Sequence, residues 1–335
     1  MSPSNIALLF QVMDLFLVPC YLILSLAAVA TSNVPILRDL ARHGKMTLNS
    51  SSNSTTGEKT HANQWMMVDK RYFSHFYIVG FICACIVASM GLGTYVRRAE
   101  ISSNIAFGLL ILHVLRRLFE CFYIHEWGGS QMHVAGYLLG LFHYLILPFV
   151  FVSVPDCDGV LSDETSTDEQ HFIFRPQAII WVVLCLYAQM QQYRHHQLLA
   201  KVRQRGYEQR KKRAVPGSAA TESIHKYHIP RGGLFQYISC PHYLAEILIY
   251  ASLLLLRSTD SRSLLPVECA DGPSLFLIEP RREALDSLKA WKAESLLLWV
   301  TTNLSVSAWN CHLWYQNTFQ DSYPHHRKAL IPFVW

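Results

Sequence analysis

The stretch from Ile229 to Tyr250 reads IPRGGLFQYISCPHYLAEILIY, and it decides the fold. Its second half is apolar enough to enter a bilayer, yet it contains His242 and Glu246. At helical spacing His242, Glu246 and Tyr250 lie on one face of a helix. A carboxylate at membrane depth costs roughly 2.5–3.5 kcal/mol, so an ionisable residue there predicts a functional site. The alternative is that Glu246 lies at a membrane interface and pairs with a neighbouring arginine.

The composition of the whole chain extends this interpretation. Of the 335 residues, 51% are hydrophobic and only 16% are charged, whereas about a quarter are charged in average soluble domains. A helix that spans a bilayer needs about 20 predominantly apolar residues. Seven segments approach that length: Ile6–Ala30, Phe73–Met90, Ile105–Ile124, His133–Val154, Gln177–Tyr193, Leu234–Leu256 and Ala293–Tyr315. We therefore predict an all-α fold, a polytopic membrane bundle of about seven transmembrane helices.

The seven segments belong to one bundle, so we expect a single domain over residues 1–335. Prolines at 266, 273 and 280 interrupt residues 257–292, which we interpret as a long variable loop. A nucleotide-binding fold of the βαβ type is excluded, because Gly91-Leu92-Gly93 lacks a third glycine and no βαβ pattern surrounds it. Any dinucleotide must therefore be held by the bundle itself.

The distribution of basic residues predicts the orientation. The first segment lacks a basic leader and contains Asp14 and Pro19, so we expect a retained first helix rather than a cleaved signal peptide. Loops opposite the N-terminus contain 18 Lys and Arg, against 9 in the loops on the N-terminal side. Because basic loops stay in the cytosol, the N-terminus is expected to be lumenal and the C-terminus cytosolic. Cys157 and Cys269 would then face an oxidising lumen, where a disulfide between them is a hypothesis.

The third segment carries a polar stripe. In HVLRRLFE, His113, Arg116 or Arg117, and Glu120 recur at i, i+3 or i+4, and i+7, which places them on one helix face. An Arg–Glu pair near a helix end would explain Arg116 and Glu120 alone. The additional His113 and Arg117 favour a helix that faces a polar cavity.

The last segment is polar in a similar way. Asn303, Ser307 and Asn310 recur at helical spacing, and His312 lies three residues before Tyr315. An interfacial belt of aromatic residues would explain Tyr315 and its neighbour Trp314. It does not explain the asparagines or His312, so this helix is also expected to have a polar inner face.

The fifth segment runs into a strongly basic stretch. Arg194, His196 and Arg203 lie near its membrane end, where they could line a phosphate site, because guanidinium groups bind phosphate through two parallel hydrogen bonds. Residues 210–213 are interpreted as ordinary cytosolic charge. The pairs His195-His196 and His325-His326 diverge by about 100° on a helix, and no acid or cysteine cluster near them in sequence completes a metal site. We expect neither a metal nor a nucleic-acid partner.

Four segments of the sequence carry a family resemblance. IPRGGLFQYISCPHYLAEILIY and SYPHHRKALIPFVW resemble the C-terminal region of steroid 5-alpha reductases. The three segments HVLRRLFE, QQYRHHQLLAKVR and SYPHHRKALIPFVW look most like the polyprenol reductase branch of that family, which makes dolichol. The C-terminal resemblance covers about the last third of the chain and excludes residues 257–292.

The resemblance implies a seven-helix bundle in the endoplasmic reticulum membrane, with NADPH bound from the cytosolic side and hydride transfer to a carbon–carbon double bond. The catalytic and cofactor region would cover about residues 177–335. Carried over by position, the family's cofactor-pocket residues here are Arg117, Gln192, His196, Arg203, Tyr227, His228, His242, Glu246, His312 and Tyr315.

The resemblance to steroid reductases is incomplete at the substrate. Those enzymes hold the steroid carbonyl with a tyrosine in the third helix and a glutamate in the second. Here Val114 stands at the tyrosine position and the second segment has no glutamate. This departure favours a different substrate, a long-chain polyisoprenoid that reaches the site sideways from membrane lipid.

The chemistry of the reaction predicts the reacting species. A hydride adds readily to a C=C bond only if a conjugated carbonyl accepts the negative charge, which a donor then stabilises. An allylic alcohol has no such acceptor, so we hypothesise that the aldehyde, polyprenal, reacts, or that oxidation of the alcohol precedes reduction. Candidate donors and acid catalysts are His113, Glu120, His312 and Tyr315.

Other functions stay open at this point. Steroids and trans-2-enoyl-CoA are the alternative substrates of a reductase. A membrane methyltransferase could use a similar cytosolic pocket and would bind S-adenosylmethionine instead of NADPH. A transporter is disfavoured, because the sequence shows no inverted repeats or paired broken helices.

Overall fold

The structure is a computed structural model that describes residues 3–33, 66–92, 101–127, 129–152, 176–213, 227–259 and 279–335. Its α-helices are α1 (Pro3–Asn33), α5 (Phe73–Leu92), α6 (Ile101–Tyr123), α7 (Val134–Val150), α8 (Pro176–Arg213), α9 (Pro241–Ser258) and α10 (Glu279–Phe319). Three short 3-10 turns accompany them: η3 (Lys70–Tyr72), η5 (Gly233–Gln236) and η7 (Gln320–Ser322). Each of the seven predicted segments falls on one of the α-helices, which confirms the all-α prediction.

Two helices extend far beyond the apolar segments predicted for them. α8 continues to Arg213 through the basic stretch, and α10 begins at Glu279, inside the loop expected over residues 257–292. That loop prediction is wrong at its C-terminal end. Pro280 is the second residue of α10, and a proline is tolerated in the first helical turn because its missing N–H has no partner there. Residues 260–278 and the proposed Cys157–Cys269 disulfide lie outside the described residues.

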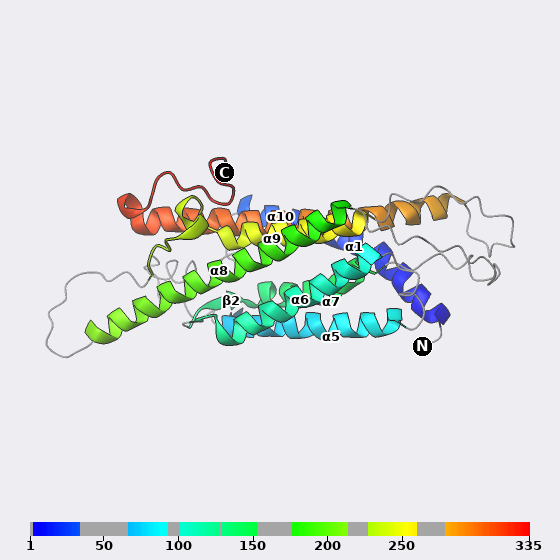
Figure 1. Cartoon of the computed structure of the whole chain (residues 1–335), viewed down its shortest axis with the longest axis horizontal. Coiled ribbons are helices and arrows are strands. Elements are labelled where there is room, and N and C mark those ends of the chain that lie inside the picture. Colours follow the sequence, from blue (N-terminus) through cyan, green and yellow to red (C-terminus); the bar gives the residue numbers. More distant parts are fainter. Residues whose placement is uncertain are drawn as a thin grey trace.

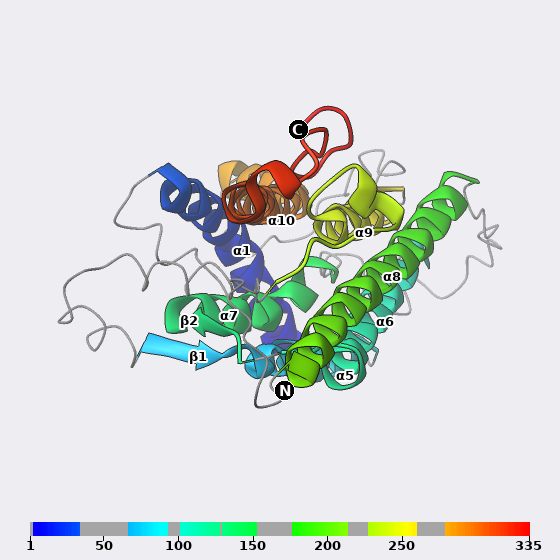
Figure 2. The same cartoon turned by 90° about the vertical axis from the view of Figure 1, so that its left-hand side faces the viewer.

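The helices form one elongated bundle (Figure 1). α8 packs along α9, α1 packs along α10, and α5 packs against both α6 and α7. A short antiparallel pair joins β1 (Met67–Asp69) to β2 (Gln131–His133). The C-terminal ends of α8 and α10 and the C-terminus of the chain lie toward the same end of the bundle (Figures 1 and 2). The single-domain prediction is untested and stays a prediction.

Two glycines let α5 and α7 approach each other closely. A Cβ added at Gly80 would lie 2.9 Å from the Tyr144 ring, and one added at Gly140 would lie 2.6 Å from the Phe76 ring. The rings of Tyr144 and Phe76 therefore fill the space that a side chain at Gly80 or Gly140 would need. Phe76 and Tyr144 stack with their ring centroids 6.2 Å apart, and both join the main core.

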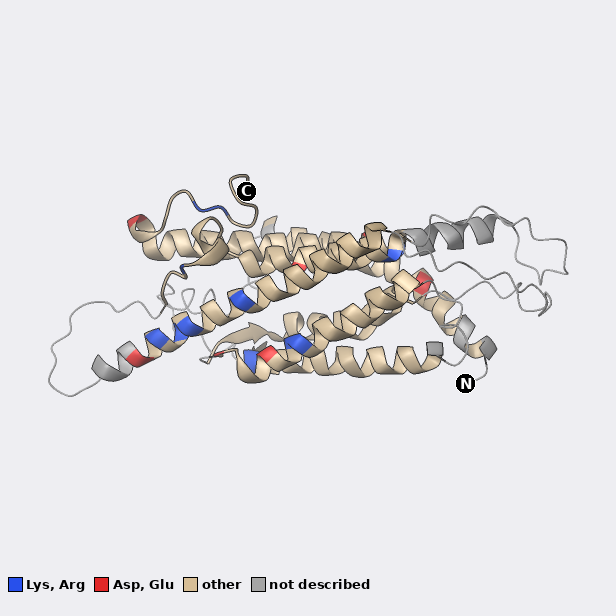
Figure 3. Cartoon of the chain, in the orientation of Figure 1, with Lys and Arg blue, Asp and Glu red and all other residues tan. Residues whose placement is uncertain are grey.

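The outer faces of the helices are apolar. Large hydrophobic side chains such as Ile23, Leu26, Ile180 and Val183 are 59–71% exposed. Exposed apolar surface on this scale is typical of a protein that contacts other apolar material, here the lipid of a membrane. The charged side chains of the described part gather elsewhere, mostly along α8 and at the end of the bundle that holds the C-terminus (Figure 3).

The count of seven spans is not confirmed. By length and apolarity, two described segments qualify as membrane spans: Leu8–Thr31 and Lys70–Met90. α7 is apolar but has only 17 residues. α6 contains Arg116, Arg117 and Glu120, and these charges lower its hydropathy although the fold turns them inward. The seven-span topology therefore stays a prediction.

Candidate active site

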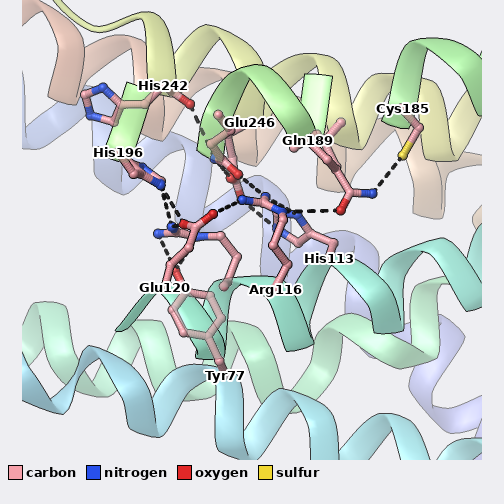
Figure 4. Close-up of polar contacts among 12 residues, drawn as sticks. Tyr77, His113, Arg116, Glu120, Cys185, Gln189, His196, His242 and Glu246 are labelled. Atoms are coloured by element: carbon pink, nitrogen blue, oxygen red, sulfur yellow. Dashed lines mark hydrogen bonds and ion pairs between the residues drawn. The ribbon is translucent and has the colours of Figure 1, made fainter. Parts of the chain in front are cut away.

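The polar stripe of α6 faces the interior of the bundle, as the sequence predicted. His113 and Glu120 are fully buried, and Arg117 is 8% exposed. Glu120 and Arg117 contact His196 of α8, and His113 contacts Glu246 of α9. Figure 4 shows His113, Glu120, His196 and Glu246 converging between these helices. The 3.6-residue period of an α-helix explains why three residues spaced over seven positions share this direction.

Glu120 is the acceptor at the centre of this network. Its carboxylate accepts hydrogen bonds from Arg116 and from Arg117, and its Oε2 lies 2.6 Å from His196 Nδ1. Arg117 Nη1 also lies 2.8 Å from His196 Nδ1. On its other side the Arg117 guanidinium donates two hydrogen bonds to Tyr77 Oη on α5. The Nε–Oη distance is 3.1 Å and the Nη2–Oη distance is 2.9 Å. Arg117 is therefore held between α5, α6 and α8.

Glu246 ends the network on α9. Its carboxylate accepts a hydrogen bond from Gln192, and its Oε1 lies 3.2 Å from His113 Nε2. The interpretation in which Glu246 pairs with an arginine at an interface is thus wrong. Gln192 in turn accepts from Arg116, so hydrogen bonds run without a break from Glu120 to Glu246.

The network balances its own charge. It contains the guanidinium groups of Arg116 and Arg117 and the carboxylates of Glu120 and Glu246. Buried ions are costly unless they are paired and their remaining hydrogen-bonding capacity is satisfied. Each of these four groups has such partners, which explains how four ionisable side chains are accommodated in an apolar bundle.

The two consecutive glycines in the quoted stretch shape the entry to α9. Gly232 and Gly233 have φ values of 96° and 53°, a region that other residues rarely adopt. The turn places Phe235 in the core, where its ring lies edge-on to His195 with centroids 5.6 Å apart. His242 follows at the start of α9, with its ring 5.5 Å from that of His196. His195 and His196 therefore face different neighbours, as adjacent helical residues should.

A second polar cluster joins the two C-terminal motifs. Ser239 Oγ lies 2.6 Å from His312 Nδ1 and 2.6 Å from Tyr323 Oη. The Ser239 backbone N–H donates to the carbonyl of Lys328 over 2.9 Å, which fastens the segment before α9 to the C-terminal tail. Tyr315 stacks on Tyr323 with centroids 5.5 Å apart and an interplanar angle of 7°.

The four predicted catalytic residues therefore divide into two groups. His113 and Glu120 belong to the network of α6, α8 and α9, whereas His312 and Tyr315 belong to the C-terminal cluster. Glu120 already accepts three contacts, so its geometry is that of a residue that positions its neighbours. The catalytic assignment stays a prediction.

The predicted cofactor residues also occupy both regions. Arg117, Gln192, His196, His242 and Glu246 lie in or beside the α6–α8–α9 network. Tyr227 packs edge-on against Trp314, with centroids 5.2 Å apart. His228 lies against Gly206 of α8, where an added Cβ would be 2.9 Å from its ring. Arg203 donates to the backbone carbonyl of Glu126.

Sequence reasoning left several contributors out of the site. Gln189 joins the network through Arg116, which the sequence offered only as an alternative to Arg117 in the polar stripe of α6. Tyr77 gave no signal, because it is an aromatic residue in an apolar helix. Arg327, in the quoted SYPHHRKALIPFVW, is 4% exposed and lies over the Tyr323 ring, and its Nε has no hydrogen-bond partner among the described residues. Burial lowers the pKa of Arg327.

One group of side chains has the composition of a metal site. Ligand atoms of Glu120, His125 and His196 lie within 4.8 Å of one another, a cluster that the sequence did not reveal. The Arg117 guanidinium, however, already donates to Glu120 and lies beside His196. Burial and the charge of Arg117 lower the pKa of His125 far below its usual value, so its ring is neutral. The Arg117 guanidinium thus already supplies a positive charge to two of the three ligand residues. The absence of a metal stays an expectation.

Comparison with known proteins shows what the chain is similar to. The model of the 3-oxo-5-alpha-steroid 4-dehydrogenase family matches residues 157–264 and 286–335, which include α8, α9 and most of α10. Over these residues the chain is similar to this family, the steroid 5-alpha reductases. Its members are reductases that act on carbon–carbon double bonds.

Similarity to curated members extends over nearly the whole chain. A polyprenal reductase of Danio rerio is 29% identical over 326 residues, which cover 89% of this chain and 87% of that protein. The human polyprenal reductase is 27% identical over 326 residues, covering 90% and 86%. The polyprenal reductase of Caenorhabditis elegans is 28% identical over 294 residues, covering 80% and 79%.

Proposed function

We propose that this protein reduces the α-isoprene double bond of polyprenal, with NADPH as the reductant, on the route from polyprenol to dolichol. One observation carries the proposal: a charge-balanced polar network is buried between α6, α8 and α9 of an apolar bundle. A bundle that served structure alone would gain little from burying these ions. The relatives, which are polyprenal reductases, supply the substrate class.

The residues at the C-terminal end of the bundle fit a dinucleotide. Arg327 Nε is a buried donor without a partner in the described ranges, and such a donor suits a phosphate oxygen. We propose that Arg327 binds a phosphate together with Arg203, and that Tyr227 and His228 flank the cofactor. Arg117, Gln192, His196, His242 and Glu246 would hold its reacting end. When bound, NADPH supplies a hydride.

The aldehyde is the form that this site can reduce. As the β-carbon of an enal gains a hydride, negative charge moves to the carbonyl oxygen, where a hydrogen-bond donor can stabilise it. An allylic alcohol offers no atom for that charge. The names of the relatives, polyprenal reductases, agree with the aldehyde as reacting species.

Different residues of the chain would deliver the proton and hold the site in position. His113 faces Glu246 and is placed to hold a proton, and His312 with Tyr315 forms the second candidate pair for proton delivery. Glu120 fixes Arg116, Arg117 and His196 in their orientations. The apolar outer faces of the helices would let a long isoprenoid remain in lipid while its head group enters the bundle.

We also propose the location of the protein. The membrane is that of the endoplasmic reticulum, with the N-terminus lumenal and the C-terminus cytosolic, where dolichol is made for protein N-glycosylation. The basic side chains along α8 lie toward the end of the bundle that holds the C-terminus, which supports a cytosolic cofactor site there (Figure 3).

Purified protein in lipid nanodiscs tests the proposal. With NADPH, polyprenal should give the α-saturated product, detected by mass spectrometry, together with loss of the NADPH absorbance. Polyprenol should give none unless an oxidising enzyme is added.

Polyprenol saturated at least as fast as polyprenal would refute the aldehyde assignment. Turnover of a 3-oxo-steroid or a trans-2-enoyl-CoA, but not of polyprenal, would move the substrate to those classes. Binding of S-adenosylmethionine without NADPH would indicate a methyltransferase.

A further inference from the structure

A cluster of buried aromatic and polar rings lies beside the network, where α1, α7, α9 and α10 meet. His143 of α7 is at its centre. Its ring centroid lies 5.9 Å from that of Tyr21 on α1, 6.4 Å from Tyr250 on α9 and 6.4 Å from Trp299 on α10. Four helices thus direct a ring to one point of the core.

Two polar atoms in this cluster have no partner. Tyr21 is completely buried and His143 is 9% exposed, yet neither Tyr21 Oη nor His143 Nδ1 makes a hydrogen bond to any residue that the structure describes. Leaving a buried donor or acceptor unsatisfied costs about 1–3 kcal/mol. Phenylalanine would fill the same space as Tyr21 without that cost. Two such atoms on facing rings therefore indicate a ligand that supplies the missing partner.

The cluster is joined to the network by two short routes. Tyr250 contacts the ring of His113 with centroids 6.1 Å apart, and His113 faces Glu246. Tyr144, next to His143, contacts Tyr77 with centroids 5.0 Å apart, and Tyr77 accepts from Arg117. A molecule held at His143 would therefore lie two rings away from the charged groups along either route.

We propose that Tyr21 Oη and His143 Nδ1 bind the terminal oxygen of the isoprenoid substrate. This inference rests on the proposed function and assigns the head-group site within it. The Tyr21 hydroxyl donates to the carbonyl oxygen of the enal, and a His143 that carries its proton on Nδ1 donates a second hydrogen bond. Val114 occupies the place of the steroid-holding tyrosine of related enzymes, so this chain needs another donor pair.

The reaction balances with these donors in place. The hydride brings its electron pair to the β-carbon, and the electrons of the C=C bond move so that the α-carbon becomes double-bonded to the carbonyl carbon. The carbonyl oxygen takes the negative charge, which the two donors stabilise. A proton, delivered by His113 or by the pair His312 and Tyr315 of the proposed function, then adds to the α-carbon, and the enolate electrons restore the C=O bond. Neither Tyr21 nor His143 is consumed.

Tyr21→Phe and His143→Phe test the assignment in nanodiscs. Each removes polar atoms while keeping a ring in the core, so both variants should fold and bind NADPH like the wild type. We expect kcat for polyprenal to fall about 10²–10³-fold, the usual effect of losing one oxyanion donor. Tyr187→Phe is the matched control, because Tyr187 lies on α8 with its side chain 52% exposed; its activity should not change. Unchanged kinetics in both core variants would overturn the inference.

A binding measurement separates this inference from the proposed function. Affinity for polyprenal and for the corresponding hydrocarbon, which lacks the oxygen, is measured for the wild type and Tyr21→Phe in nanodiscs. The wild type should prefer the aldehyde, and the variant should lose that preference. Equal preference in both proteins overturns the head-group site whether or not turnover occurs. If the wild type binds the aldehyde selectively but forms no saturated product, only the proposed reaction is overturned.

Discussion

Lys292 Nζ donates a hydrogen bond to Asp14 Oδ1 over 2.6 Å, across 278 positions of sequence. Both residues are buried, Lys292 completely and Asp14 to 3% exposure. The same ammonium group donates to the backbone carbonyls of Val152 over 3.1 Å and Phe149 over 3.3 Å. The three contacts join α10 to α1 and to the end of α7, so this ion pair holds the bundle together away from the active site.

Breaking the pair should destabilise the protein strongly. Lys292→Met leaves the Asp14 carboxylate buried without its counter-ion, a situation that costs about 3–5 kcal/mol in other proteins. We expect a correspondingly lower thermal midpoint in detergent. In the double variant Asp14→Leu with Lys292→Met no charge remains, so most of the lost stability should return. A Lys292→Met protein as stable as wild type would contradict the ion pair.

The close approach of α5 and α7 predicts a steric effect at Gly140. In Gly140→Ala the new methyl group would meet the buried Phe76 ring, and overpacking of this kind costs about 1–3 kcal/mol. Gly108→Ala on α6 is the control, because a Cβ there meets nothing within 4 Å. Its better helix propensity should stabilise the protein by up to about 1 kcal/mol. Equal melting temperatures of the two variants would show that α5 and α7 can move apart without a loss of stability.

The geometry of Arg117 predicts that lysine cannot replace it. Arg117→Lys keeps the positive charge but cannot contact Tyr77, Glu120 and His196 at once, because an ammonium lacks the planar fork of a guanidinium. Loss of a hydrogen bond to a charged group, worth about 1.5–3 kcal/mol, should lower kcat/KM at least about tenfold. Arg205→Lys, on the exposed surface of α8, should retain full activity.

Tyr77→Phe provides a second check on Arg117. If the two residues act together, the effects of Tyr77→Phe and Arg117→Lys on kcat/KM should be less than additive in the double variant. Additive effects would show that the contact between them does not contribute to activity.

Ser239 should control the orientation of His312. Ser239→Ala removes the hydroxyl that contacts both His312 Nδ1 and Tyr323 Oη, so the imidazole loses its fixed tautomer and direction. We expect roughly a tenfold fall in kcat with little change in KM, and partial recovery with Ser239→Thr. Ser258→Ala is the control, since among the residues that the structure describes its hydroxyl bonds to the Leu255 carbonyl of its own helix alone. A change in KM with kcat unchanged would argue against a role for His312 in proton delivery.

Local sequence pattern was sufficient for the helices and for the direction of their polar faces. The spacing of His113, Arg117 and Glu120 requires a common face, whatever packs against it. The same holds for His242, Glu246 and Tyr250, which reach His196, Gln192 and His113 from one side of α9. The pattern was insufficient at the start of α10, where Pro280 looked like a break and instead occupies a first helical turn.

The sequence by itself determined that this is an apolar helical bundle with ionisable residues on inner faces, and its quoted motifs indicated the family that it resembles. Only the tertiary structure decided which charges meet: Glu246 with His113 rather than an arginine, Glu120 with both guanidiniums, and Asp14 with Lys292. It also separated His312 from His113. The physical reason is that helical periodicity fixes the direction of a side chain, whereas its partner depends on how distant helices pack.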